Sequence, residues 1–265
     1  MKLGVSTACF YGKEHVEDTF EILKNMGVDT TEVLLNTFSE YEKPFVEELV
    51  KRKELMKVHS VHAHGTCFEP ELFSSYSRIR DDAEAIFKKV CISAFMLGAK
   101  NVTFHGPFAK RGRAVNVNMS DFTKRLNELC DVAESCGVSI AYENVNWAYC
   151  DTPDFFKAIK EQCPRLKGTL DIKQAIYSGV DPYKFLDVME DRLVTVHICD
   201  MDNKNKPTLP PEGKFNFEKL FRELNARTPL VTVLLEVYNY CYRDYEHLAE
   251  SYHTLRDMLN KVVSG

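Results

Sequence analysis

Four residues that can hold a metal ion follow one another in the second half of the chain, each at the end of an apolar run. They are Glu143, Asp171, His197 and Glu236, separated by 28, 26 and 39 residues. Carboxylate oxygens and an imidazole nitrogen are donors that divalent cations accept, so the chemistry open to this set is metal-assisted. Each interval is long enough for one helix and the strand that follows it.

Each of these residues, taken alone, has an ordinary structural explanation, because carboxylates cap helices and buried histidines find hydrogen-bond partners. The group as a whole is harder to explain in that way. Three carboxylates brought to adjacent strand ends would repel one another, and burying them without a cation would be costly. One divalent ion would reduce the formal charge of the set from −3 to −1. We therefore expect one such ion as the cofactor, and Mn, Mg, Co and Zn are all compatible with these ligands.

The elements that must position these residues are recognisable as eight short runs rich in β-branched residues, alternating with segments of helical periodicity. The predicted strands are Lys2–Ala8, Thr30–Leu35, Lys57–Ala63, Asn101–His105, Val138–Glu143, Lys167–Asp171, Leu193–His197 and Val231–Val237. Eight strand–helix steps over 265 residues are typical of a (β/α)8 TIM barrel, which is an α/β fold. A single domain covering residues 1–265 is the favoured organisation.

An open, doubly wound sheet is the main structural alternative. Such a sheet usually carries a glycine-rich phosphate loop after its first strand, and the corresponding segment here, Cys9–Lys13, has no such motif. Local signals agree with the alternation of strands and helices. Gly27, Gly98 and Gly137 are positioned to end helices in the left-handed conformation, and Thr152, followed by proline, is a typical helix start.

The composition excludes several classes of function. The chain has 34 basic and 39 acidic residues and a net charge of −5, which argues against a protein that binds nucleic acid through a cationic face. No stretch of 18 consecutive apolar residues is present, so no membrane-spanning helix is expected. Nine scattered cysteines, an odd number without a CxxC pair, indicate reduced thiols and a cytoplasmic protein.

The residues that end the last four predicted strands resemble the metal-binding signature of the xylose-isomerase-like barrel superfamily. The matching segments are Glu143-Asn144, Leu170-Asp171, Val196-His197 and Leu235-Glu236, together with His62 and His105-Gly106-Pro107. This superfamily includes sugar isomerases and epimerases, inosose dehydratases, hydroxypyruvate isomerases and endonuclease IV. The resemblance implies that one divalent ion is held by Glu143, Asp171, His197 and Glu236.

The resemblance also implies a reaction. A metal ion that bridges a carbonyl and the adjacent hydroxyl acidifies the intervening C–H bond and stabilises a cis-enediolate. Glu143 and Glu236 are then the catalytic residues that move the proton. Two bases on opposite faces would permit epimerisation, and a single base would permit a 1,2 proton shift. We expect a metal-dependent isomerase or epimerase whose partner is a small-molecule sugar or sugar phosphate, with no nucleic acid and no membrane.

Seven further residues are predicted to bind the substrate, because they follow strands whose ends border the active site of such a barrel. They are His62, His105, Trp147, Lys173, Gln174, Arg111 and Arg113. The two arginines belong to a short basic run that could receive a phosphate or carboxylate, or could be a solvated loop. Glu32, inside the second strand, is expected to form a structural ion pair. Asp200 could orient His197 or cap the loop that follows it.

Two other functions stay open. An endonuclease IV-like DNA repair enzyme would need three metal ions and further histidines, and none occurs between His197 and Glu236. A non-catalytic sugar-binding barrel could carry the same ligands. The well-known ketohexose 3-epimerases have a glutamate and an arginine six residues after the positions of Glu143 and His197, where this chain has Tyr149 and Asn203. That difference argues against a ketohexose 3-epimerase specifically.

Overall fold

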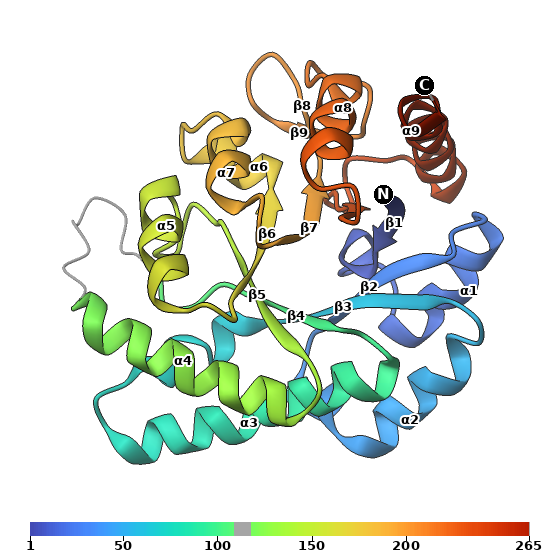
Figure 1. The fold of residues 1–265 in the computed structure, drawn as a ribbon. Coiled ribbons are helices and arrows are strands. Elements are labelled where there is room, and N and C mark those ends of the chain that lie inside the picture. The colour runs from blue at the N-terminus through green and yellow to red at the C-terminus, as the bar shows by residue number, and fades with distance from the viewer. Residues whose placement is uncertain (109–117, 265) are drawn as a thin grey trace.

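Eight parallel strands close into a barrel in the computed structural model, which describes residues 1–108 and 118–264 (Figure 1). Their order around the barrel is β1-β10-β7-β6-β5-β4-β3-β2, so barrel strands that follow one another in the chain are also neighbours in space. The strands are β1 (Lys2–Ser6), β2 (Thr30–Leu35), β3 (Lys57–Ala63), β4 (Asn101–Phe104), β5 (Ser139–Glu143), β6 (Lys167–Asp171), β7 (Leu193–Ile198) and β10 (Thr232–Leu235). The predicted TIM barrel is confirmed.

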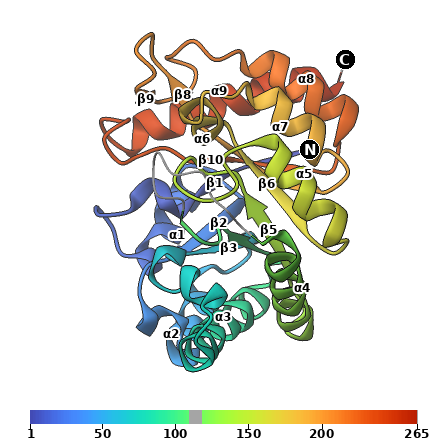
Figure 2. The same ribbon diagram turned by 90° about the vertical axis from the view of Figure 1, so that its left-hand side faces the viewer.

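Helices lie on the outside of the barrel, as Figure 2 shows from a second direction. They are α1 (Val16–Asn25), α2 (Lys43–Arg52), α3 (Ser77–Leu97), α4 (Met119–Ser135), α5 (Pro153–Gln162), α6 (Ile172–Tyr177), α7 (Pro182–Met189), α8 (Phe217–Arg227) and α9 (Tyr245–Ser264). A small antiparallel ribbon of β8 (Asp200–Met201) and β9 (Pro207–Thr208) follows β7. Short 3-10 helices are η1 (Thr7–Phe10), η2 (Phe38–Tyr41), η3 (Gly65–Cys67) and η4 (Pro70–Phe73). None of the described helices is both long enough and apolar enough to cross a membrane.

The ends of the helices form as the sequence predicts. Gly27, Gly98 and Gly137 have φ angles of 72°, 83° and 82°, the left-handed region that residues with a side chain rarely adopt. Thr152 begins α5 by accepting the backbone N–H of Phe155 on its side-chain oxygen. Direct helix-to-strand turns therefore connect several elements without long loops.

The strand ends differ from the predicted ones by one or two residues. β1 ends at Ser6 and not at Ala8, because the Ser6 side chain accepts the N–H of Ala8 and begins η1. The last strand covers Thr232–Leu235, so Glu236 is the first residue after β10 and not its penultimate one. At β1, side-chain capping thus ends the strand earlier than the apolar pattern does.

An apolar core lies between the strands and the helices that cover them. Phe87 on α3 contacts Phe104 on β4 edge to face, with ring centroids 5.9 Å apart. The ring of Phe156 on α5 lies against Gly168 on β6, where a larger residue would crowd it. The inside of the barrel is polar by comparison, with hydroxyl and carboxyl side chains fully buried. The outer layer therefore supplies the hydrophobic stabilisation, and the interior can hold polar groups.

A β-bulge in β3 creates a contact across the barrel. Successive residues of β2 pair with Val58 and Ser60, which leaves His59 between them without a partner in the ladder. The His59 Nε2 atom lies 2.9 Å from Thr195 Oγ1 on β7, on the opposite side of the barrel. Burial lowers the pKa of His59 to about 4, although the charge of Glu32 opposes this shift.

Replacing His59 with glutamine should make the stability of the fold less sensitive to acid. His59 stays neutral in the folded protein down to about pH 4, whereas the unfolded chain takes up a proton near pH 6.5. The unfolded state therefore binds more protons in this window, and stability falls as the pH falls, by at most about 1.4 kcal/mol per unit from this residue. Between pH 7 and pH 4.5, urea unfolding should show the wild type losing about 2 kcal/mol more than His59→Gln. Identical pH profiles would contradict this.

Candidate metal centre

The four predicted metal ligands converge at the C-terminal end of the barrel. Glu143 and Asp171 end β5 and β6, His197 is the penultimate residue of β7, and Glu236 follows β10. One donor atom from each residue lies within 4.8 Å of the donor atoms of the other three, and all four residues are buried. The strands bring them together because the ends of parallel strands meet on one side of a barrel.

Side chains next to the ligands fix the ends of β5 and β6 relative to each other. The Asn144 amide donates to the backbone carbonyl of Asp171 at 2.9 Å and accepts the N–H of the same residue at 2.8 Å. The Oδ1 atom of Asp171 accepts the N–H of Gln174 at 2.8 Å and thereby begins α6. One carboxylate oxygen of Asp171 is held in this way, and Oδ2 lies 3.6 Å from Lys173 Nζ.

His197 has both of its ring nitrogens among carboxylates. Its Nδ1 atom lies 3.0 Å from Glu143 Oε1 and 3.5 Å from Glu236 Oε2, on the side of the other donors. Its Nε2 atom lies 3.0 Å from Glu32 Oε1. Burial opposes protonation, but the three carboxylates outweigh it and raise the pKa of His197 well above its ordinary value. Because Nδ1 lies on the side of Glu143 and Glu236, it is the nitrogen that can hold an ion together with them.

The titration of the carboxylates reflects the negative charge gathered at this point. Burial raises the pKa of Asp171 to about 7; Lys173 opposes this rise, and Glu143 adds to it. Burial also disfavours ionisation of Glu143, but the charges of His197 and His105 hold its pKa well below its ordinary value. The buried Oε2 atom of Glu143 has no hydrogen-bond partner among the described residues. A carboxylate oxygen without a donor, beside a carboxyl group that resists ionisation, fits a cation site.

A second group of donors adjoins the first and shares Glu143. The Nε2 atoms of His62 and His105 lie 2.9 Å apart, and His105 Nε2 lies 3.2 Å from Glu143 Oε2. A contact this short between two ring nitrogens needs one proton between them, so one ring accepts from the other. Donor atoms of His62, His105 and Glu143 also lie within 4.8 Å of one another. This group could hold a substrate hydroxyl or a second cation.

Glu69 fixes the orientation of His105. Its Oε2 atom accepts the backbone N–H groups of His105 and Gly106 at 2.8 Å each and lies 3.4 Å from His105 Nδ1. Burial opposes the charged ring, but Glu69 and Glu143 raise the pKa of His105 to about 9. Sequence reasoning missed Glu69, because it lies in the loop after β3 and no spacing pattern distinguishes it from other loop carboxylates.

A cavity of about 290 Å³ opens above the donors. The predicted site residues that line it are His62, His105, Glu143, Trp147, Asp171, Lys173, Gln174 and Glu236. His197 lies beneath them and is only 1% exposed. Tyr11, His64 and Tyr238 also line the cavity and were not predicted; the ring of Tyr238 has the Nζ atom of Lys173 4.6 Å from its centroid.

Asp200 caps a loop and does not orient His197. Its carboxylate accepts the backbone N–H groups of Met201, Gly213 and Phe215 at distances of 2.7 to 2.9 Å. The residue beside Nε2 of His197 is instead Glu32, which was predicted to form a structural ion pair. The sequence shows which strand a residue belongs to, but it does not show which side chains from other strands will contact that residue.

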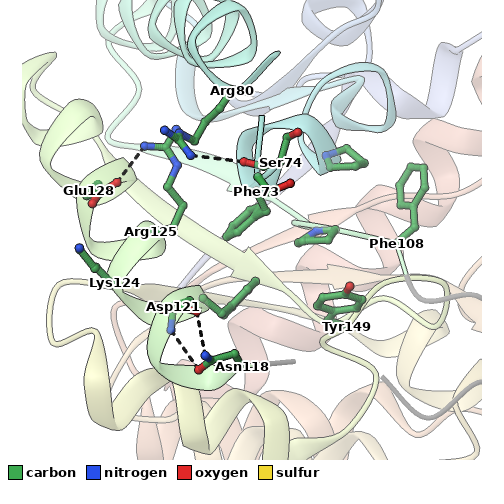
Figure 3. Close-up of a pocket in the computed structure, with 14 residues that line it drawn as sticks. Phe73, Ser74, Arg80, Phe108, Asn118, Asp121, Lys124, Arg125, Glu128 and Tyr149 are labelled. Atoms are coloured by element: carbon green, nitrogen blue, oxygen red, sulfur yellow. Dashed lines mark hydrogen bonds and ion pairs between the residues drawn. The ribbon is translucent and has the colours of Figure 1, made fainter. Parts of the chain in front are cut away.

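A larger cavity of about 790 Å³ lies beside α3 and α4 (Figure 3). It holds none of the predicted site residues that the structure describes. Several of its polar groups already have partners: Arg125 donates to the carbonyl of Leu72 and lies 3.1 Å from Glu128, while Asn118 caps α4. The predicted site residues that the structure describes gather instead around the smaller cavity.

The predicted anion-binding residues Arg111 and Arg113 lie outside the described residues, so their role stays a prediction. The chain before them is described as far as Phe108, whose ring centroid lies 5.2 Å from that of Trp147. Phe108 lines the larger cavity and Trp147 the smaller one, so this aromatic contact lies at the boundary between the two.

The sequence matches the model of the xylose isomerase-like TIM barrel family over residues 20–261. The chain belongs to this family. The match begins within α1 and ends within α9, so it includes all the strands that carry the converging donors. The resemblance inferred from the strand ends is thereby confirmed.

Several known proteins are similar to this member of the family. Uncharacterized protein MJ1614 of Methanocaldococcus jannaschii is 27% identical over 247 residues, which cover 89% of this chain and 92% of that protein. Fructoselysine 3-epimerase of Escherichia coli O157:H7 is 27% identical over 118 residues, which cover 42% of this chain and 43% of that enzyme. The crystal structure of a D-tagatose 3-epimerase-like protein has a TM-score of 0.81 at 21% identity, with 99% of this chain and 98% of that chain covered. The structural similarity shows the shared fold.

Replacing Gly65 with alanine should displace Glu69 and disturb the end of β4. A Cβ atom on Gly65 would overlap the Glu69 carboxylate, which holds the N–H groups of His105 and Gly106. Because leaving buried N–H groups without their acceptor costs about 1–3 kcal/mol, Gly65→Ala should lower the free energy of unfolding by that amount and shift both amide resonances. Urea unfolding and ¹H–¹⁵N spectra measure these effects. Thr66→Ala, at an exposed neighbour, is the control, and unshifted His105 and Gly106 resonances in Gly65→Ala would refute the contact.

Proposed function

We propose that this protein is a metal-dependent isomerase or epimerase of a sugar or sugar phosphate, which moves a proton at a carbon next to a carbonyl group. The observation that carries the proposal is the convergence of Glu143, Asp171, His197 and Glu236 under a cavity of about 290 Å³. A cavity near this size suits a small molecule. The similarity to fructoselysine 3-epimerase supports the same class of reaction.

The residues present fit a divalent ion, because three carboxylates and one imidazole nitrogen face a common point and one buried carboxylate oxygen has no donor. We assign Glu143, Asp171, Glu236 and the Nδ1 atom of His197 as its ligands. A bound ion would supply positive charge to stabilise the negative charge that develops on the substrate oxygens. The donor types do not select between Mn, Mg, Co and Zn.

Glu143 and Glu236 are the residues that we assign to proton transfer. They belong to β5 and to the residue after β10, which are separated by two strands in the barrel, and both line the cavity. One carboxylate would take the proton from the substrate carbon, and the other would return a proton to the opposite face, which inverts that carbon. Return of the proton to the neighbouring carbon by the same carboxylate would give isomerisation. The electron pair of the broken C–H bond stays on the substrate, so no oxidant is needed.

The remaining residues of the cavity are assigned to substrate binding. The Nε2 atoms of His62 and His105 share one proton in this structure; a bound sugar would replace that contact with hydrogen bonds from each ring to its hydroxyls. Lys173 is buried between Asp171 and Glu236, with its Nζ atom 3.6 Å and 3.8 Å from their oxygens. We assign its ammonium to a substrate oxygen, since it is a donor beside the reacting centre.

Trp147 and Gln174 complete the proposed substrate site. The Trp147 ring, 5.0 Å from that of His105, offers an apolar face to the C–H side of a sugar. Gln174 accepts the N–H of Asn146 on its side-chain oxygen at 3.3 Å, which leaves its amide nitrogen available to the substrate. Both residues line the cavity.

The surroundings of Tyr149 support a substrate other than a free ketohexose. This residue stands where the ketohexose 3-epimerases are expected to carry a second glutamate. Its ring packs against Phe122 and Phe155, with centroids 6.1 Å and 6.2 Å away. The position therefore contributes to apolar packing and supplies no carboxylate to the cavity.

A nuclease receives less support. In the part of the chain that the structure describes, the donor groups number three, and each of them contains Glu143 or Glu236. They therefore overlap around the one cavity, and no separate third site extends from it. A barrel that binds a sugar without converting it is distinguished from an enzyme by proton exchange at the substrate carbon.

Purified protein, stripped with a chelator and reloaded, should bind one divalent ion per chain. His197→Ala should bind that ion at least about 100-fold more weakly, because it removes one of the four donors. His64→Ala is the matched control, since His64 lines the cavity but belongs to none of the donor groups. Elemental analysis gives the stoichiometry and chelator competition the affinity. A second ion per chain would assign His62, His105 and Glu143 to a second site, and absence of binding would contradict the proposed centre.

Glu143→Gln and Glu236→Gln should each reduce proton exchange at the substrate carbon by at least about 100-fold. Ketoses, aldoses and their phosphates are incubated in D₂O with the metal-loaded wild type, and loss of a C–H resonance identifies the substrate. Both variants are compared at saturating metal, because each residue is also a proposed ligand. Glu128→Gln, in the larger cavity, is the control and should exchange at the wild-type rate. Full exchange in either active-site variant would rule out the two-base mechanism, and a complete lack of exchange in the wild type would favour a binding protein.

A further inference from the structure

Glu32 is a charged residue buried inside the barrel that the proposed reaction does not use. It lies in the middle of β2 and is fully inaccessible to solvent. Burying a carboxylate is costly unless it is paired and hydrogen-bonded. Neither the proposed proton transfer nor substrate binding requires it, so its retention inside the barrel calls for a different function.

Three hydroxyl groups from three different strands hold the Glu32 carboxylate. Ser60 and Thr103 each donate to Oε2 at 2.7 Å, and Ser6 donates to Oε1 at 3.3 Å. Oε1 also lies 3.0 Å from His197 Nε2. Strands β1, β3 and β4 thus fix the carboxylate, and its position relative to His197 is set by the barrel itself.

These contacts leave Glu32 with no capacity for an ion of its own. Its oxygens come within 4.8 Å of donor atoms of His62 and Glu236, which places the three residues in one possible donor group. A carboxylate has about four acceptor sites; the three hydroxyls use three of them, and the ring of His197 lies 3.0 Å from Oε1, where the fourth is. Glu32 is therefore better suited to hold other side chains than to bind a cation.

His197 needs such a partner if it is to bind an ion. A ligating imidazole offers one nitrogen to the metal and carries a proton on the other, and a carboxylate or carbonyl on that proton fixes the ring. Nδ1 of His197 faces Glu143 and Glu236, so Nε2 must carry the proton. Among the described residues Nε2 makes no hydrogen bond of good geometry, and at 1% exposure the ring is closed to solvent. Glu32 Oε1, 3.0 Å away, is the carboxylate oxygen placed to accept its proton.

We propose that Glu32 is the positioning residue of this centre: it accepts the Nε2 proton of His197 and so turns Nδ1 toward Glu143, Asp171 and Glu236. The same oxygen lies 3.5 Å from Nδ1 of His62, whose ring is parallel to that of His197 within 16°. One carboxylate thus aligns a ligand ring and a substrate-binding ring. The inference rests on the metal centre of the proposed function, but not on the identity of the sugar.

The test compares full-length wild type with Glu32→Gln and Glu32→Asp, using Zn²⁺ as the probe. Chelator competition should give a dissociation constant about 10–100-fold higher in Glu32→Gln, the usual cost of losing such a partner, and an intermediate value in Glu32→Asp. In the zinc-loaded protein, ¹⁵N-labelled His197 should show a ligated Nδ1 and a strongly downfield Nε2 proton, and this proton signal should move upfield in Glu32→Gln. A purely structural role would change stability and leave both the affinity and the His197 signal unaltered.

Glu69→Gln is the matched control, because Glu69 is an equally buried carboxylate that contacts His105 and not His197. It should leave the His197 signals unchanged. Wild-type zinc affinity in a folded Glu32→Gln would overturn the inference. So would a wild type that binds two ions and a Glu32→Gln variant that loses one of them, because Glu32 would then be a ligand. If Glu32→Gln does not fold, wild-type affinity in Glu32→Asp overturns it instead. Zinc binding by the wild type without exchange on any sugar would refute the proposed reaction and leave this inference standing.

Discussion

Mutual repulsion between buried carboxylates is the interaction on which the rest of this structure depends. Glu32, Glu143, Asp171 and Glu236 lie inside or at the end of one barrel, where charges interact far more strongly than in water. Each must therefore be compensated locally, by hydroxyl groups, by imidazoles, by the ammonium of Lys173 and, in the proposed function, by a cation. The polar interior of the barrel is a consequence of this requirement.

The compensating groups are arranged in layers along the barrel. Hydroxyls of Ser60 and Thr103, inside the strands, hold the deepest carboxylate, Glu32. The next layer, at the strand ends, contains the converging donors. Loops supply the outermost groups, among them Glu69 and Trp147. The apolar contacts that stabilise the barrel lie in a separate layer, between the strands and the helices.

The barrel and its converging donors could be predicted because both follow from a pattern in the chain. A carboxylate or histidine that ends an apolar run, repeated at strand–helix intervals, must come to one side of a closed parallel sheet. No such pattern predicts the contacts of Glu32 and Asp200. Glu32 meets His197 from a strand three places away around the barrel, and Asp200 turns toward the N–H groups of its own loop. These contacts depend on side-chain direction across the barrel and on loop conformation, which local spacing does not encode. Local conformation also explains why β1 ends two residues before its predicted end. The Ser6 side chain caps a 3-10 turn that begins inside the apolar run.

Trp147 gives the protein a built-in optical probe. It is the only tryptophan in the chain, it is half-buried at the edge of the cavity, and its ring lies 5.0 Å from that of His105. Tryptophan emission from this protein therefore originates at one place, beside the imidazole of His105, which lines the same cavity. Occupancy of the site by an ion or a small molecule can be followed from the intensity and wavelength of that emission, in unlabelled protein and without any turnover.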